Sequence, residues 1–228
     1  MRENLIDVTR LLDCRMQGRL PTGVDRVNLE YVRHFGDRSN ALVLFAGQWI
    51  ELSIADSEKI FAALLADANN VNAMIRRVVA GSLMRCIGRS FSTPRFLLNT
   101  EPSGVERMHY ARRIQRLGLK PLFFLHDLIP ITHPEYCRSG ESRRHQHRVN
   151  AMLTLGHGVI ANSTVTQVEL VAYASKNNLP IPPSTVALLP AAELSVANAA
   201  APIDVPYFLM LGTIEHRKNQ SLLLQLWR

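Results

Sequence analysis

The sequence predicts an α/β fold built on a doubly wound, mainly parallel sheet, and three observations carry that prediction. Short apolar runs with strand character alternate with amphipathic helical stretches, which is the order expected of βαβ units. The run Leu122–Leu125 is apolar without interruption, as expected of a strand buried on both faces. The chain has 228 residues, of which 47% are hydrophobic, so it can bury the core of a Rossmann-like domain.

Seven short runs of aliphatic and aromatic residues are the strand candidates. They are Leu5–Val8, Ala41–Phe45, Phe96–Asn99, Pro121–Leu125, Gly158–Ala161, Val186–Leu189 and Tyr207–Leu211. The first six are expected to belong to one sheet, and the seventh is expected to start a second.

The helices are expected between these runs. In Val105–Leu117 the apolar residues recur at every third position, while arginines occupy another face. The pattern Thr164-x-x-Gln167 is a capping box that predicts the start of a later helix. We expect the valines of that helix to point inward: Val165, Val168 and Val171.

The domain organisation follows from a change in composition near the C-terminus. Between Ala191 and Pro206 the pattern gives way to Ala, Pro, Ser and Asn, which indicates an interdomain linker. We therefore predict a complete α/β domain at 1–190, a linker at 191–206, and at 207–228 the first βα unit of a second, incomplete Rossmann-like domain.

The net charge of +7 indicates an anionic partner: nucleic acid, an anionic membrane surface or a phosphorylated substrate. No aromatic RNA-binding motif, zinc finger or helix-turn-helix pattern is present, so no nucleic acid is expected. The three scattered cysteines lack a CxxC spacing, which favours reduced thiols in a cytoplasm and supports no structural zinc site. The charged N-terminus has no signal-peptide h-region, and no apolar run approaches the ~20 residues of a membrane span.

Two basic stretches have more than one interpretation. Asn72–Arg89 alternates apolar residues with arginines and is expected to be a packed surface helix, with a helix lying on anionic lipid as the alternative. Ser142–Arg148 is expected to be a solvated basic helix face. His145 and His147 lie two positions apart, point to different faces and make a poor metal-binding pair.

The first candidate site is the segment Pro21–Val27, a glycine loop that leads into a helix. Gly23 allows the backbone to approach a ligand closely, and the free N–H groups of the first helical turn favour negative charge. The alternative is an ordinary βα turn. The helix is expected to present three residues on one face: Val27, Tyr31 and Phe35.

The second candidate is His126, directly after the predicted strand Pro121–Leu125. Ligands of open α/β sheets bind at the carboxyl ends of the strands, so this position favours a functional role as much as a structural one. A metal site combining His126 with Asp127, His133 and Glu135 is disfavoured, because two prolines intervene and no helical HxxxH or HExxH spacing exists.

The third candidate is the run Gly212–Asn219, between a predicted strand and a predicted helix at Ser221–Trp227. It combines a glycine turn with two adjacent cations, Arg217 and Lys218, at a helix N-terminus. This combination favours an anion, most readily a phosphate.

In the order TGVDRV, HDLIPITHPEY, VIANSTVT and GTIEHRKNQ, these segments resemble the retaining nucleotide-sugar glycosyltransferases of family 4, which have the two-domain GT-B fold. The chain is most similar to bacterial mannosyltransferase-like members that assemble surface polysaccharides. The likeness runs from Asp7 to Gln220. It implies metal-independent transfer of a sugar, for example mannose, from a nucleotide sugar such as GDP-mannose to a polysaccharide or lipid-linked acceptor. It also implies a cytoplasmic location, with peripheral contact at the inner face of the membrane.

The resemblance implies roles for individual residues. His126 matches the active-site histidine that faces the donor sugar and its diphosphate. Arg217 and Lys218 match the catalytic cations that neutralise the leaving nucleoside diphosphate as its negative charge grows. The residues implied on the donor side are Gly23, Gly212, Thr213, Arg217 and Lys218. Those implied on the acceptor side are Thr22, Arg26 and Asp127.

The chain departs from the family pattern at two positions and in extent. His216 stands where the family commonly has proline, and Gln220 where it commonly has histidine. The family's paired-glutamate donor motif would follow Arg228, so we expect a truncated or split enzyme that is inactive alone. The alternative is a non-catalytic α/β binding or interaction module, a remnant or one half of a split enzyme.

Overall fold

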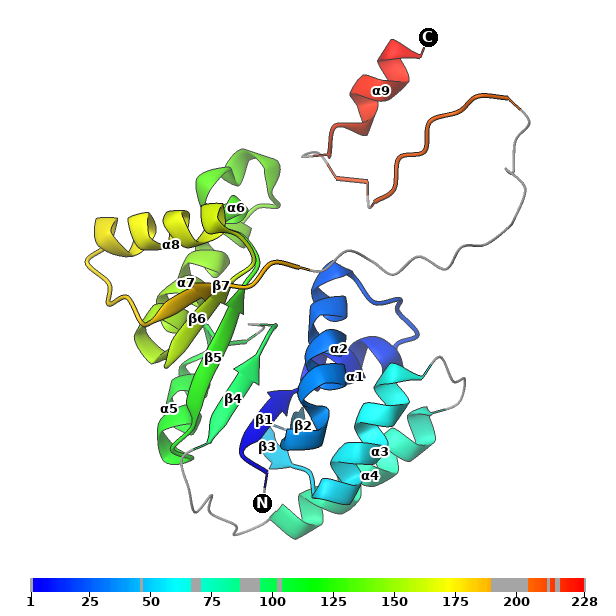
Figure 1. Cartoon of the computed structure of the whole chain (residues 1–228), viewed down its shortest axis with the longest axis vertical. Coiled ribbons are helices and arrows are strands. Elements are labelled where there is room, and N and C mark those ends of the chain that lie inside the picture. The colour runs from blue at the N-terminus through cyan, green and yellow to red at the C-terminus, as the bar shows by residue number, and fades with distance from the viewer. Residues whose placement is uncertain are drawn as a thin grey trace.

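The fold is seen in a computed structural model that describes residues 2–45, 47–66, 71–86, 95–101, 104–189, 205–212, 214–215 and 218–227. A seven-stranded sheet has the order β3-β2-β1-β4-β5-β6-β7, and all neighbouring strands are parallel except the antiparallel pair β2 and β3 (Figure 1). The strands are β1 Asn4–Asp7, β2 Ser39–Phe45, β3 Gln48–Glu51, β4 Phe96–Asn99, β5 Lys120–Leu125, β6 Gly158–Ala161 and β7 Ser184–Val186. The predicted Rossmann-like α/β fold is confirmed.

Helices cover both faces of the sheet, because successive strand residues point to opposite sides. In β1 Leu5 belongs to one core cluster and Ile6 to the other, and in β4 Leu97 and Leu98 divide in the same way. Helices α1 to α4 pack on the Ile6 face, and α5, α7 and α8 pack on the Leu5 face (Figure 1). The helices are α1 Thr9–Met16, α2 Gly23–Phe35, α3 Ile54–Leu65, α4 Asn72–Cys86, α5 Met108–Arg116, α6 Ile129–Thr132, α7 Glu141–Leu155, α8 Thr164–Lys176 and α9 Gln220–Leu226.

Strand β3 was not expected from the sequence. It pairs with β2 across a two-residue turn at which Gly47 has a φ of 73°. A left-handed residue in so short a turn suits glycine and closes a hairpin. Glu51 of β3 then receives two hydrogen bonds from Arg95, at 2.6 and 2.5 Å, which tie this edge strand to the start of β4.

The predicted inward face of α8 is wrong. Val165 and Val168 are 67% and 61% exposed, whereas the buried residues of the helix are Thr166, Leu170 and Ala174. The N-cap is Ser163, whose Oγ accepts the Thr166 N–H at 3.1 Å, so the helix begins one position earlier than the Thr164 capping box implies. Thr166, Leu170 and Ala174 recur at every fourth position and form the stripe that packs inward, so the face carrying Val165, Val168 and Val171 is left toward solvent, with Val171 38% exposed.

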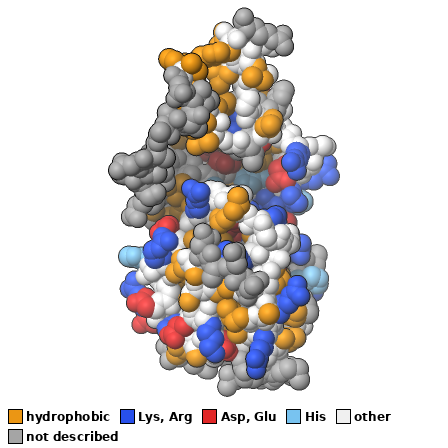
Figure 2. All heavy atoms as spheres, turned by 90° about the vertical axis from the view of Figure 1, so that its right-hand side faces the viewer, with side chains coloured by type: hydrophobic (Ala, Val, Ile, Leu, Met, Phe, Trp, Pro, Cys, Tyr) orange, Lys and Arg blue, Asp and Glu red, His pale blue; other side chains and the backbone are white. Residues whose placement is uncertain are grey.

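The predicted strand at Tyr207–Leu211 is also wrong. No strand occurs in the described residues from 205 to 227, and the large apolar side chains of this segment are exposed. In Figure 2 hydrophobic side chains of this region lie at the top of the view. A parallel strand forms only beside another strand that takes up its backbone hydrogen bonds, and none lies beside this run in the described part of the chain. The helix predicted at Ser221–Trp227 is present as α9.

The basic helix α4 packs on the sheet. Ile75 and Val79 are buried in the Ile6-side core, so its apolar face lies against the protein. The later part of the predicted stretch, residues 87–89, lies outside the described residues. Among the helices that the structure describes, none has the length and apolar character needed to cross a membrane.

Candidate functional site

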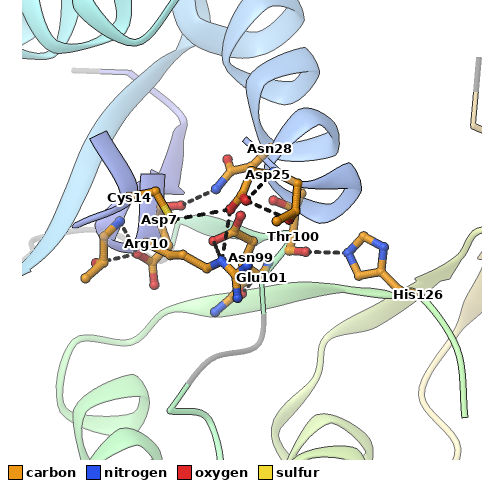
Figure 3. A network of polar contacts seen from close by, with 11 residues as sticks. Asp7, Arg10, Cys14, Asp25, Asn28, Asn99, Thr100, Glu101 and His126 are labelled. Carbon is orange, nitrogen blue, oxygen red and sulfur yellow. Dashed lines mark hydrogen bonds and ion pairs between the residues drawn. The ribbon is translucent and has the colours of Figure 1, made fainter. Parts of the chain in front are cut away.

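The topological switch point of the sheet lies between β1 and β4. From β1 the chain proceeds to β2 on one side and later to β4 on the other, so the loops that follow β1 and β4 diverge. In open α/β sheets this divergence places ligands outside the carboxyl ends of the strands. Polar side chains gather there in one connected set, which we call the switch-point network (Figure 3). Its members are Asp7, Arg10, Cys14, Asp25, Asn28, Asn99, Thr100, Glu101 and His126.

Asp25 is the centre of the switch-point network and shapes the start of α2. It occupies the third position of the helix and accepts hydrogen bonds from the backbone N–H and the Oγ1 of Thr22, at 2.7 and 2.6 Å. Its other oxygen accepts a hydrogen bond from Arg10 Nε at 2.9 Å. Burial alone would raise the pKa of Asp25, but the hydrogen bonds from Arg10 and Thr22 hold that pKa well below its ordinary value. Asp25 is therefore an anion at neutral pH.

Glu101 approaches Asp25 from the loop that follows β4. Its backbone N–H donates to Asn99 Oδ1 at 3.2 Å, and its carboxyl group is buried beside Asp25 and Arg10. Burial, together with the hydrogen bond to Asp25, raises the pKa of Glu101 to about 9, and the charge of Arg10 offsets only part of that shift. Glu101 is therefore a neutral carboxylic acid at neutral pH.

Asparagines hold the surrounding loops in place. Asn99 Nδ2 donates to the buried Tyr110 hydroxyl at 3.0 Å, and Asn28 Nδ2 donates to the Asp7 carbonyl at 3.1 Å. Asp7 Oδ1 in turn accepts the N–H and the hydroxyl of Thr9, at 3.0 and 2.6 Å. Burial raises the pKa of Asp7 despite these hydrogen bonds. These contacts fix α1, α2 and α5 around the ends of β1 and β4.

The accessible groups of the site are Arg10 and the first turn of α2. The Arg10 side chain is 38% exposed, so the network presents a cation to solvent. Gly23 is exposed, and a Cβ built on it would have no atom within 4 Å. Neither packing nor a left-handed φ requires a glycine there, and its absent side chain leaves the backbone open to a ligand. A cation beside free helical N–H groups is suited to bind an anion.

His126 lies at the carboxyl end of β5, as predicted. Its Nε2 is 2.9 Å from the Thr100 carbonyl, and because a carbonyl only accepts, Nε2 carries the proton. Burial lowers the pKa of His126 and outweighs the opposing effect of that hydrogen bond, so the ring is neutral at neutral pH. The ring rests against Phe124, and Nδ1 is left as a hydrogen-bond acceptor.

Asp127 and His145 have structural contacts. The Asp127 carboxylate accepts the Ile129 N–H at 3.1 Å, and its carbonyl is 3.0 Å from His145 Nε2. His145 is partly buried and burial lowers its pKa, so the expectation that it lies on a solvated basic face is wrong. Helix α7 turns this histidine toward the loop after β5, where it holds the loop that carries His126.

The structure brings some predicted site residues together and leaves others apart. Thr22 and Gly23 lie at the same edge of the sheet as His126, and Arg26 is exposed on the first turn of α2. Gly212 and Lys218 adjoin each other in the C-terminal segment. Gly212 has a φ of 144°, and a Cβ there would lie 2.6 Å from Lys218 Nζ, so only glycine leaves room for that side chain as placed. Thr213, His216 and Arg217 lie outside the described residues.

Sequence reasoning missed Arg10 and Glu101 and gave no role to Asp25. Two signals could have found them. Glu101 follows the apolar strand β4 closely, in the same relation that singled out His126 after β5. Thr22-x-x-Asp25 is a capping pattern at a glycine-containing helix start.

Within the described ranges there is no group of three or more His, Cys, Asp or Glu residues placed to hold a metal ion. Comparison of the chain with protein-family models, with curated proteins and with solved structures gives no match.

Proposed function

We propose that the α/β domain is the acceptor-side domain of a retaining nucleotide-sugar glycosyltransferase with a GT-B architecture. In this proposal a sugar such as mannose passes from a nucleotide sugar, for example GDP-mannose, to a polysaccharide or lipid-linked acceptor. One observation carries the proposal. Gly23 and His126, from two motif segments far apart in the sequence, lie at the same carboxyl edge of the sheet beside its switch point.

The chemistry of this edge suits a sugar diphosphate. The partly exposed Arg10 guanidinium and those N–H groups at the start of α2 that Thr22 does not cap offer positive charge to phosphate oxygens. The open space at Gly23 admits a phosphate close to the backbone. Neutral His126 offers Nδ1 to a sugar hydroxyl, because its Nε2 proton is committed to Thr100.

The C-terminal segment supplies the remaining charge in this proposal. Lys218, with Arg217, would neutralise the nucleoside diphosphate as it departs. Gly212 accommodates the Lys218 ammonium group within the same short segment. In the same proposal these cations would act on the donor, while Thr22, Arg26 and Asp127 would face the acceptor.

A binding experiment with a matched pair of variants tests the proposal. Gly23→Val places a branched side chain at the first residue of α2, and Thr164→Val places the same side chain at the first residue of α8, after β6. Saturation-transfer NMR with GDP-mannose, UDP-glucose and free guanosine should show nucleotide-sugar binding to the unmodified chain and to Thr164→Val. Gly23→Val should bind about tenfold more weakly, because the valine fills the phosphate position.

Equal affinity of Gly23→Val and the unmodified chain for the nucleotide sugar would contradict the phosphate position. Absence of binding by the unmodified chain would contradict the transferase proposal and favour the non-catalytic interaction module.

A further inference from the structure

Two buried carboxyl groups of the switch-point network, Asp25 in the first turn of α2 and Glu101 in the loop after β4, share one cation, Arg10. The side chains of Asp25 and Glu101 are 0% and 4% exposed, and Arg10 Nε lies 2.9 Å from an oxygen of Asp25 and 3.5 Å from an oxygen of Glu101 (Figure 3). Ionised carboxylates are acceptors only, so a hydrogen bond between two of them requires a proton. Arg10, the cation that contacts both groups, cannot neutralise two charges at once.

The hydrogen-bond partners indicate which carboxyl group holds the proton. Asp25 already accepts from Thr22 through two donors and from Arg10 Nε at 2.9 Å. No donor among the described residues reaches either carboxyl oxygen of Glu101, and Arg10 Nε is 3.5 Å from the nearer one. Because these three donors stabilise its carboxylate, Asp25 stays ionised. Glu101 keeps the proton and donates it to Asp25.

We propose that Glu101 is a positioning residue that works as a neutral carboxylic acid, tying the first turn of α2 to the loop after β4. Through Asp25 the proton of Glu101 connects three segments: α1 by way of Arg10, the start of α2 by way of Thr22, and the end of β4. If Glu101 lost its proton, two buried carboxylates would repel each other. Moving the Thr22–Gly23 turn away from the β4 loop would relieve this repulsion.

The groups around the pair reinforce this assignment. The titratable and charged side chains that act on the pair from neighbouring elements are Asp7 at β1 and Arg10 and Cys14 on α1. Arg10 is the single cation in this set. A second ionised carboxylate would add negative charge to a place that already contains Asp25 and Asp7.

Direct observation of the proton tests the proposal in the whole chain. With glutamate side chains labelled with ¹³C, NMR should reveal one carboxyl group that is protonated at neutral pH and titrates near pH 9. Glu101→Gln should remove this signal, because the amide replaces the acid with a neutral hydrogen-bond donor of similar shape. Glu58→Gln, at an exposed glutamate, should leave it in place.

Amide hydrogen exchange gives a second readout. Glu101→Gln should keep the slow exchange of the Thr22 and Arg26 amides, which donate to Asp25 and to the Thr22 carbonyl, since the Gln amide still donates to Asp25. Glu101→Ala should speed that exchange about tenfold, because Asp25 loses a donor and the contact to the β4 loop. The proposal is overturned if every glutamate carboxyl is ionised at neutral pH, or if the Gln and Ala variants exchange alike. Should Glu101→Ala fail to fold, the titration of the unmodified chain decides. Neither readout needs a ligand, so failure here is distinguishable from failure of the transferase proposal.

Discussion

The α/β domain and the C-terminal segment carry similar local sequence patterns and have very different structures. In both, an apolar run precedes polar residues and a helix. In the domain Leu97 of β4 is completely buried between neighbouring strands, whereas Leu211 of the C-terminal run is 81% exposed and lies in no strand. The difference teaches that an apolar run becomes a parallel strand only where adjacent strands accept its hydrogen bonds.

The same difference extends to the two candidate anion sites. The switch-point network draws its residues from the ends of β1, β4 and β5 and from α1 and α2, so each charged group has partners from distant parts of the chain. Gly212 and Lys218 contact each other within one short segment. A site formed at strand ends is held by the sheet, and a local glycine–lysine contact is not.

The largest contrast is expected from a matched pair of leucine truncations. Leu97→Ala should lower the free energy of unfolding by about 2–5 kcal/mol, because it opens a cavity in the core on the Leu5 face of the sheet. Leu211→Ala should change it by less than about 0.5 kcal/mol, because the side chain is already in solvent. Urea denaturation followed by circular dichroism measures both. A comparable loss in the two variants would show that the C-terminal run is buried in solution.

Removing the central anion of the network should have the next largest effect. Asp25→Ala should cost about 2–3 kcal/mol, because Thr22, Arg10 and Glu101 lose their common partner, while Arg10 can still turn toward water. The exposed Asp37, which is 3.9 Å from Arg38, provides the control. Asp37→Ala should cost less than about 0.5 kcal/mol in the same denaturation experiment. Similar values for the two aspartates would argue against a connected network.

Glu101 should make stability fall as the solution becomes alkaline. Its pKa is raised from 4.5 to about 9 on folding, so between these values the folded chain binds a proton that the unfolded chain has lost. In that window the free energy of unfolding decreases as pH rises, by up to about 1.4 kcal/mol per pH unit from this group. Glu101→Gln should abolish this component. An unchanged pH profile in the variant would assign the slope to other groups.

His126 should make the smallest contribution to the pH dependence of stability, and its sign should be opposite to that of Glu101. Burial lowers its pKa below the ordinary 6.5, so the unfolded chain binds a proton more readily and stability falls as pH drops through that value. We expect a loss below about 1 kcal/mol, absent in His126→Gln. The ¹⁵N shifts of the ring should identify a neutral imidazole with its proton on Nε2. A charged ring at pH 7 would contradict the assignment.

The sequence was informative where the signal was local or repeated. The apolar runs located five of the seven strands, while the run predicted at Val186–Leu189 overlaps β7 only at Val186. The position of His126 after one of these runs placed it correctly at the sheet edge. Strand β3 was missed because it is a short edge strand in a hairpin. The α8 valines were assigned to the wrong face because the buried stripe is formed by Thr166, Leu170 and Ala174 at every fourth position, not by the valines at every third.

The network itself depends on tertiary contacts that no local pattern specifies. Arg10 is polar and follows β1, and Glu101 follows β4, but their meeting requires that the two strands be neighbours. The proton on Glu101 follows from the burial of its side chain, and that burial is known only once α1, α2 and the β4 loop are packed. The glycine in Pro21–Val27 could be identified from the sequence, whereas the open space around it could not.

The central claim is that the carboxyl edge at the switch point, rather than the C-terminal segment alone, receives the donor. Amide chemical-shift mapping during a titration with GDP-mannose tests it most directly. The account predicts the largest shifts at residues 22–26, 100–101 and 126–127, and weaker binding in Gly23→Val than in Thr164→Val. Shifts confined to residues 205–227, with the two variants binding alike, would contradict it.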